Sequence, residues 1–390
     1  MLKILSVVGT RPNFVKIAPL LAEMRRWPGV CPVLVHTGQH FDREMSDCFL
    51  DELRIPAPDF VLRRCASAGV ADMVSALREV IRSESPDVVL VVGDVNSTLA
   101  GAEAAAGLGI PVAHVEAGLR SFDPGMVEER NRIATDQLSE LLFASEPSGV
   151  VNLLAEGRPR DSIFLAGNVM IDTLKEFLAA ARRSTALTRL GLADERGTPR
   201  PYALATLHRP ATVDNPEALR RIWGALEEIA DDLPVIFPAH PRTQTRLGDC
   251  GLANRDSGTA GVRLIGPLPY LDFVRLESAA ALVMTDSGGV QEETTAMCVP
   301  CLTLRNNTER PITVREGTNQ VVGLDPAAIV AAARRVLSGN VKTGRIPRLW
   351  DGRSAQRIVS TLCRHYGTRR ERAGQELRIP VQAVPAAVAC

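Results

Sequence analysis

Short apolar runs alternate with helical stretches over most of the 390-residue chain. The first 170 residues contain six runs rich in Val, Ile and Leu that show no polar alternation, namely residues 3–9, 32–38, 87–94, 111–118, 141–145 and 162–167. Runs of this kind are typical of strands that are buried on both faces of a parallel sheet. Helical patterns such as FVKIAPLLAEMRRW lie between them. The alternation predicts a Rossmann-like, doubly wound α/β domain over residues 1–170.

A second series of apolar runs predicts a second domain of the same class over residues 171–352, with strands at 202–208, 234–240, 262–266, 281–286 and 301–305. The Pro-, Gly- and charge-rich segment at 195–201 marks the entry to its sheet. Two such domains leave a central cleft, where a ligand is expected. Residues 353–367 predict a C-terminal helix that packs back toward the first domain, and 368–390 a partly disordered tail.

The charge balance and the lengths of the apolar runs bear on whether the chain binds nucleic acid or a membrane. The chain has 45 basic and 45 acidic residues, so no global field favours nucleic acid or an anionic membrane. No run approaches the roughly 18 apolar residues of a membrane span. The N-terminal apolar stretch is about six residues long, too short for the core of a signal peptide. We expect neither nucleic acid nor a membrane as a partner.

The eight cysteines show no regular framework, which predicts a reducing, cytoplasmic setting. The one close pair is Cys298 and Cys301, and no second pair or histidine cluster completes a metal site. Free cysteine commonly behaves as a small buried hydrophobe, and we predict no metal.

Polar residues follow the strands of the second domain at the edge where parallel sheets bind ligands. Ser287, Gly288 and Gly289 come directly after ALVMTD and open a helix. Such a helix start favours an anion, glycines let the backbone approach it, and the serine hydroxyl can cap the helix or donate to a phosphate oxygen. A pair of acids ending in Glu293 suits sugar or ribose hydroxyls, and Arg310 after the next strand suits a diphosphate.

The first domain places cations and carboxylates at its strand ends. Arg11 follows the first strand, and Lys16 lies one helical turn further on. Asp94 and Glu116 each end an apolar strand, and Glu128 opens a helix. Up to three acids therefore face the anion-binding turn across the cleft, and buried carboxylates of this kind can exchange protons.

Two strands of the second sheet end in a histidine followed closely by an arginine, at His208 and at His240.

No Gly-x-Gly-x-x-Gly turn follows the first strand and no Walker lysine loop occurs, which disfavours NAD redox chemistry and P-loop phosphoryl transfer. Acid–base chemistry on a bound phosphorylated organic molecule is the prediction that remains.

At these residues the sequence resembles the non-hydrolysing UDP-N-acetylglucosamine (UDP-GlcNAc) 2-epimerases, enzymes of the GT-B type fold. The matching segments span residues 9–323 in family order and include GTRPNFVKIAPL, GDVNST, HVEAGLRSFD, EERNR, TLHRPATVDNP, TDSGGVQEE and NTERP. The resemblance covers the whole two-domain unit, and HVEAGLR together with TDSGGVQEE is highly specific.

The resemblance implies reversible conversion of UDP-GlcNAc to UDP-N-acetylmannosamine (UDP-ManNAc). The C2 proton is removed, UDP leaves C1 to give a 2-acetamidoglucal, and UDP adds back after protonation on the other face. It also implies no cofactor and a homodimer. Carried over by position, the catalytic residues are Asp94, Glu116, Glu128 and His208. The substrate-binding residues are Arg11, Lys16, Arg132, Ser287, Gly288, Gly289, Glu293 and Arg310. Which carboxylate takes which proton stays open.

Other functions fit parts of the same pattern. The substrate can instead be a UDP-2,3-diacetamido sugar or its uronic acid, because one sequence does not fix the C3 and C6 substituents. A hydrolysing epimerase would use the same site if water reached the glucal. A GT-B glycosyltransferase needs fewer carboxylates, and intact acids and cations disfavour a non-catalytic nucleotide-sugar sensor.

The sequence departs from the family pattern in segments linked to a second, activating UDP-GlcNAc site. Phe41 and Asp42 form an apparent insertion, and residues 209–211 read Arg-Pro-Ala in place of Arg-Arg-Glu. These changes predict weak or absent activation by UDP-GlcNAc. Cys298 stands where a glycine usually ends the helix, which concerns local stability.

Overall fold

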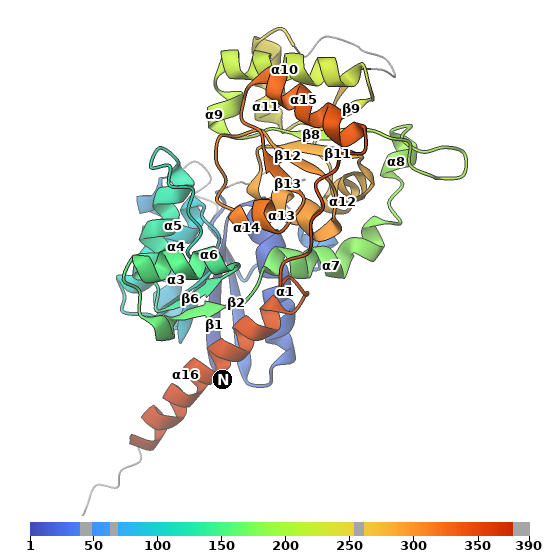
Figure 1. Ribbon diagram of the computed structural model, residues 1–390. Coiled ribbons are helices and arrows are strands. Elements are labelled where there is room, and N and C mark those ends of the chain that lie inside the picture. The colour runs from blue at the N-terminus through green and yellow to red at the C-terminus, as the bar shows by residue number, and fades with distance from the viewer. Residues whose placement is uncertain (40–48, 63–68, 253–260, 377–390) are drawn as a thin grey trace, which may run out of the picture.

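Two parallel β-sheets, each covered by helices, build the molecule (Figure 1). The computed structural model describes residues 1–39, 49–62, 69–252 and 261–376, with side chains up to residue 367. The expected insertion at Phe41 and Asp42 lies outside this part of the chain. The predicted fold, two doubly wound α/β units facing each other, is confirmed.

The N-terminal sheet has the strand order β3-β2-β1-β4-β5-β6-β7, and all its pairings are parallel. Its strands are β1 (Leu2–Val8), β2 (Val30–His36), β3 (Phe60–Val61), β4 (Val88–Val92), β5 (Val112–Val115), β6 (Leu141–Ala144) and β7 (Ile163–Leu165). All residues of β4, β5 and β6 are buried, as expected for strands that helices cover on both faces.

The second sheet has the order β10-β9-β8-β11-β12-β13, again all parallel. Its strands are β8 (Ala203–Thr206), β9 (Val235–Pro238), β10 (Val262–Ile265), β11 (Leu282–Thr285), β12 (Cys301–Thr303) and β13 (Asn319–Val321). Strands β3 and β13 were absent from the sequence-based prediction, because each is only two or three residues long. Neither forms an apolar run.

Helices connect the strands and cover the sheets. They are α1 (Arg11–Arg26), α3 (Val70–Glu84), α4 (Asn96–Ala106), α5 (Val127–Leu138), α6 (Pro147–Ala155), α7 (Val169–Ala181), α8 (Ala186–Arg189), α9 (Pro210–Val213), α10 (Pro216–Ala230), α11 (Pro241–Asp249), α12 (Tyr270–Ala279), α13 (Gly288–Met297), α14 (Pro311–Arg315), α15 (Pro326–Leu337) and α16 (Ser354–Glu376). In the described residues, no helix is long and apolar enough to cross a membrane.

Both sheets reverse their strand order at one place, between β1 and β4 in the first and between β8 and β11 in the second. Connections leave such a switch point in opposite directions, which opens a crevice outside the carboxyl ends of the two strands. Arg11, Asp94, His208 and Ser287 each lie within three residues of the end of one of these four strands. The topology therefore brings the predicted site residues to the two crevices.

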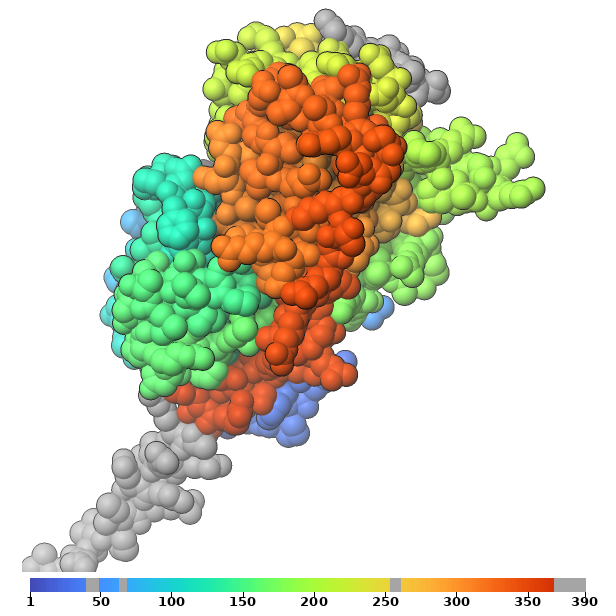
Figure 2. Space-filling view, viewed as in Figure 1, coloured from blue at the N-terminus to red at the C-terminus, as the bar shows by residue number. Residues whose placement is uncertain are grey.

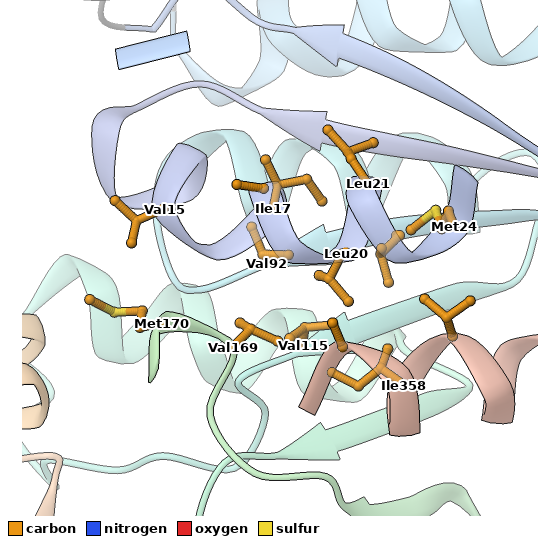
Figure 3. Packing of buried hydrophobic residues seen from close by; sticks show 14 of the residues in the cluster. Val15, Ile17, Leu20, Leu21, Met24, Val92, Val115, Val169, Met170 and Ile358 are labelled. Carbon is orange, nitrogen blue, oxygen red and sulfur yellow. The ribbon is translucent and has the colours of Figure 1, made fainter. Parts of the chain in front are cut away.

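The largest apolar cluster joins the N-terminal sheet to helices from distant parts of the chain. Figure 3 shows Ile17 of α1, Val169 of α7 and Ile358 of α16 gathered near the strand residues Val92 and Val115. The same cluster includes Tyr270, from α12 of the second domain. The two domains are thus joined by continuous packing.

The C-terminal helix α16 contacts α1, α7 and β1, and in the space-filling view of Figure 2 its described part (red) lies against the N-terminal domain. The Asp172 carboxylate accepts a hydrogen bond from the Ala355 N–H at 2.7 Å near the start of this helix. The helix continues to Glu376, past the boundary expected at 367. Gly367 costs a helix only about 1 kcal/mol, and the Arg, Glu and Ala residues that follow are good helix formers.

Candidate active site

A cavity of about 540 Å³ lies between the domains and is lined by both. Ten of the twelve predicted site residues line it, namely Arg11, Lys16, Asp94, Glu128, His208, Ser287, Gly288, Gly289, Glu293 and Arg310. Glu116 and Arg132 are not among its lining residues. Both are buried behind the cavity wall, where they contact residues that line it.

The Ser287-Gly288-Gly289 turn starts α13 at the cavity. Ser287 is the N-cap residue, but its side chain makes no capping hydrogen bond. A Cβ added to Gly288 would lie 2.8 Å from a carboxylate oxygen of Glu309, so a larger residue here would have to displace that carboxylate. The turn therefore presents the helix N-terminus to the cavity, where an anion is favoured.

Arg310 connects the two domains through a buried ion pair with Glu116. Its guanidinium lies 2.6 Å from the Glu116 carboxylate of the first domain and 2.7 Å from Glu292 of the second. Lys16 approaches the other oxygen of Glu116 to 2.8 Å. Burial lowers the pKa of Arg310, but Glu292, Glu116 and Glu309 raise it more, so the guanidinium stays charged. Glu116 is thus held between two cations.

Asp94 is held as a carboxylate. One of its oxygens lies 3.1 Å from Nε of Arg132, which is itself fully buried and also pairs with Glu129. Burial raises the pKa of Asp94, but Arg132, Lys16 and other nearby cations lower it to about 2. Asp94 is therefore ionised near neutral pH.

A second ion pair crosses the cleft between Arg209 and Glu128, at 2.7 Å. Arg209 also lies 3.2 Å from Glu309, whose pKa burial would raise but nearby arginines hold well below its usual range. The sequence analysis placed Arg209 beside His208 but did not assign it to the site. Its position directly after the strand-end histidine was the available signal.

His208 projects from the end of β8 with about half of its side chain exposed. Asp286 holds the turn by accepting the backbone N–H groups of His208 and Arg209 at 3.0 and 2.9 Å. Burial lowers the pKa of His208, and Arg209 and Arg305 lower it further, against the opposing effect of Asp286 and Glu128. The ring is therefore neutral at neutral pH, able to donate and accept hydrogen bonds.

Three other carboxyl groups near the cavity favour the protonated form. Burial raises the pKa of Glu292 to about 8 and those of Glu293 and Glu146 to about 7. Glu293 accepts a hydrogen bond from the hydroxyl of Tyr270 at 3.0 Å. The cavity therefore holds both ionised and protonatable acids. Tyr270 and Glu146 were not predicted, although Glu146 directly follows the predicted strand 141–145, which was the available signal.

A neighbouring cavity of about 370 Å³ shares Ser287 and His208 with the first. Its walls include the apolar residues Pro267, Leu268 and Phe273. This surface suits a flat ring, and it lies beside the anion-binding turn.

The described residues contain no group of three or more His, Cys, Asp or Glu that could hold a metal ion. Cys301 is buried in β12, and Cys298 is exposed at the end of α13. The sequence analysis interpreted Cys301 as a small buried residue of a strand, and this interpretation agrees with the structure.

Comparison with known proteins adds independent evidence. A family model described as UDP-N-acetylglucosamine 2-epimerase matches residues 22–363. A UDP-N-acetylglucosamine 2-epimerase of Methanocaldococcus jannaschii is 38% identical over 93% of this chain and 99% of its own length. A UDP-2,3-diacetamido-2,3-dideoxy-D-glucuronate 2-epimerase of Pseudomonas aeruginosa is 40% identical over 87% of this chain and 94% of its own length.

Solved structures show the same likeness. The structure of the M. jannaschii enzyme in complex with UDP-GlcNAc and UDP superposes with a TM-score of 0.83, covering 93% of this chain and 99% of that one. The Neisseria meningitidis UDP-GlcNAc 2-epimerase bound to UDP-GlcNAc is 31% identical, also with a TM-score of 0.83, over 93% of this chain and 100% of that one.

Proposed function

The chain belongs to the UDP-N-acetylglucosamine 2-epimerase family, and on this premise we propose that it interconverts UDP-GlcNAc and UDP-ManNAc. The observation that carries the proposal is the cavity between the domains. It combines a helix N-terminus for a diphosphate with carboxylates from the opposite domain.

Binding of UDP is assigned to the second domain. The N-terminus of α13 and the Arg310 guanidinium suit the diphosphate, and Glu293 suits the ribose hydroxyls. The uracil ring fits the apolar wall at Leu268 and Phe273. The sugar then extends toward Asp94 and the first domain.

The chemistry follows from the weak acidity of the sugar C2–H bond. Loss of this proton must be coupled to departure of UDP from C1, and the cations at the diphosphate stabilise the negative charge of the leaving group. Lys16 and Arg310 both line the cavity, and Arg310 keeps its charge. Elimination gives a 2-acetamidoglucal with UDP still bound.

The acid–base pair is drawn from Asp94, Glu116 and Glu128. Asp94 is ionised but its low pKa makes it a weak base, whereas Glu128 lies at the opening of α5 and pairs with a cation of the other domain. Reprotonation of C2 on the opposite face, followed by return of UDP to C1, completes epimerisation. Closure of the cleft around the bound sugar would keep the glucal from escaping.

Incubation of the purified protein with UDP-GlcNAc tests the proposal. NMR should show UDP-ManNAc appearing up to an equilibrium ratio, and the same ratio should be reached from UDP-ManNAc. Free ManNAc with UDP would instead identify a hydrolysing epimerase. Failure to convert either nucleotide sugar refutes the proposal.

A second substrate is favoured by the P. aeruginosa relative, which acts on a UDP-diacetamido-glucuronate according to its name. The same elimination would run on that sugar, since its reacting C1 and C2 are alike. Parallel assays with UDP-GlcNAc and UDP-2,3-diacetamido-2,3-dideoxy-D-glucuronate compare kcat/KM. A higher value for the glucuronate assigns that substrate.

The predicted homodimer and the predicted cytoplasmic location belong to the same proposal. The absence of a regular cysteine framework in the sequence supports the cytoplasmic setting. Light scattering coupled to size-exclusion chromatography measures the oligomeric state, and a 42 kDa species would refute the dimer.

A further inference from the structure

Behind the cavity, a buried pair is formed by His114 of β5 and Asp136 of α5. Neither side chain has any exposed surface, and neither residue lines the cavity. Nδ1 of His114 lies 2.7 Å from one carboxylate oxygen of Asp136, and Nε2 lies 2.8 Å from the carbonyl oxygen of Gly93. The pair thus bridges the ends of two strands.

The other oxygen of Asp136 accepts the backbone N–H of Gly118 at 3.0 Å. Gly93 directly precedes Asp94, and Gly118 follows Glu116 by two residues. One His–Asp pair is therefore bonded to both backbone turns that carry the two carboxylates.

These turns have unusual backbone geometry. Gly93, Glu116 and Gly118 all have positive φ, at 72°, 75° and 79°. Such a conformation is unfavourable for a residue with a side chain and persists only where the surroundings enforce it. A Cβ on Gly93 would also lie 2.7 Å from Nζ of Lys16, so the turn is confined on that side too. Hydrogen bonds from the buried pair supply part of this constraint.

The hydrogen-bond partners fix the orientation of the His114 ring. The Asp136 carboxylate accepts from Gly118 and, at 2.6 Å, from Arg120, both at the oxygen that does not face the ring. Burial raises the pKa of Asp136, but His114 and Arg120 lower it below its usual value. The second ring nitrogen faces the carbonyl oxygen of Gly93. Both ring nitrogens therefore have a partner, and the ring cannot turn without losing one of them.

We propose that His114 and Asp136 are positioning residues for the proposed epimerisation, and that together they fix the turns of Asp94 and Glu116. The proposal rests on the proposed function of the cavity. Neither residue touches the substrate, and both act through the backbone.

The first test is Asp136→Asn, which keeps the shape of the side chain. The amide cannot accept from His114, Gly118 and Arg120 as the carboxylate does. We expect kcat to fall by about 10- to 100-fold, because a small misplacement of a catalytic group by a distant mutation can cost about 100-fold. KM and the calorimetric Kd for UDP should stay within threefold, because UDP is assigned to the other domain. Glu140→Gln is the matched control, since Glu140 pairs with His365 at 2.8 Å, and its kcat should stay unchanged.

The second test needs no variant of Asp136. The wild-type protein is labelled with ¹⁵N in its six histidine rings, and the His114 signals are identified by their loss in His114→Gln. We expect ring N–H exchange with solvent to be slow at His114, because the ring is buried and both of its nitrogens have partners. Fast exchange overturns the proposal, as does an unchanged kcat in Asp136→Asn or an equal loss of UDP affinity. If the wild type epimerises no tested sugar, the proposed function fails, and the NMR result still decides whether the His114 ring is held.

Discussion

The protonation of Glu292 gives the sharpest prediction of stability. This carboxyl group is fully buried in α13 and lies 2.7 Å from Nε of Arg310. Burial raises its pKa from 4.5 to about 8, and nearby Glu116 and Glu146 act in the same direction, against Arg310 and Lys16. The folded chain therefore keeps a proton that the unfolded chain loses.

The sign of the pH dependence follows from this difference. Below about pH 4.5 both states hold the proton, and the stabilisation is fully present. As the pH rises from 4.5 to 8, only the folded state holds it, so the free energy of unfolding decreases. One proton corresponds to a slope of about 1.4 kcal/mol per pH unit. Glu293 and Glu146 act in the same direction up to about pH 7, so the variant must be compared with the wild type.

Glu292→Gln keeps the size of the side chain and removes the titrating proton. Urea denaturation of the wild type and the variant, without ligand and at fixed ionic strength, gives the free energy of unfolding between pH 5.5 and 7.5. We expect the slope of the variant to be shallower by about 1.4 kcal/mol per pH unit. Glu79→Gln, on the exposed face of α3, is the control and should keep the wild-type slope. Equal slopes for Glu292→Gln and the wild type would refute the reasoning.

Three further predictions concern catalysis, regulation and local stability. Glu116→Gln should lower the rate of proton exchange at C2 at least about 100-fold. The affinity for UDP should stay within a few-fold of the wild type, because Arg310 keeps its contact with Glu292. Loss of UDP binding in calorimetry would instead show that Glu116 has a structural role. Initial velocities with UDP-ManNAc should be hyperbolic without added UDP-GlcNAc, and strict dependence on UDP-GlcNAc would contradict the expected loss of activation. Cys298→Gly should stabilise the protein by about 0.5–1 kcal/mol, because Cys298 ends α13 with a φ of 57°. Cys250→Gly, at the end of α11 with a φ of −87°, should give no gain in urea denaturation.

The strands could be predicted from the sequence because their signal is local. Buried parallel strands such as Val88–Val92 are continuous apolar runs, and the residues that follow them necessarily lie at one sheet edge. Asp94, His208 and Ser287 follow such strands, and all three line the cavity. The prediction failed for Asn319–Val321, a three-residue strand with polar residues.

The contacts between domains could not be predicted in the same way. The ion pairs of Arg310 with Glu116 and of Arg209 with Glu128 join residues far apart in the chain, and they depend on how the domains dock. Tyr270 reaches Glu293 for the same reason. No local pattern records such docking, so these partners emerge only from the three-dimensional structure.

The most direct test of the central claim is exchange of the C2 proton with solvent. UDP-GlcNAc is incubated with the protein in deuterated water, and C2 of both nucleotide sugars is followed by NMR. Elimination and re-addition predict that UDP-ManNAc formed in the first turnovers carries deuterium at C2. UDP-ManNAc that forms with its original C2 hydrogen retained, or the absence of exchange in any tested UDP-N-acetylhexosamine, would contradict the account.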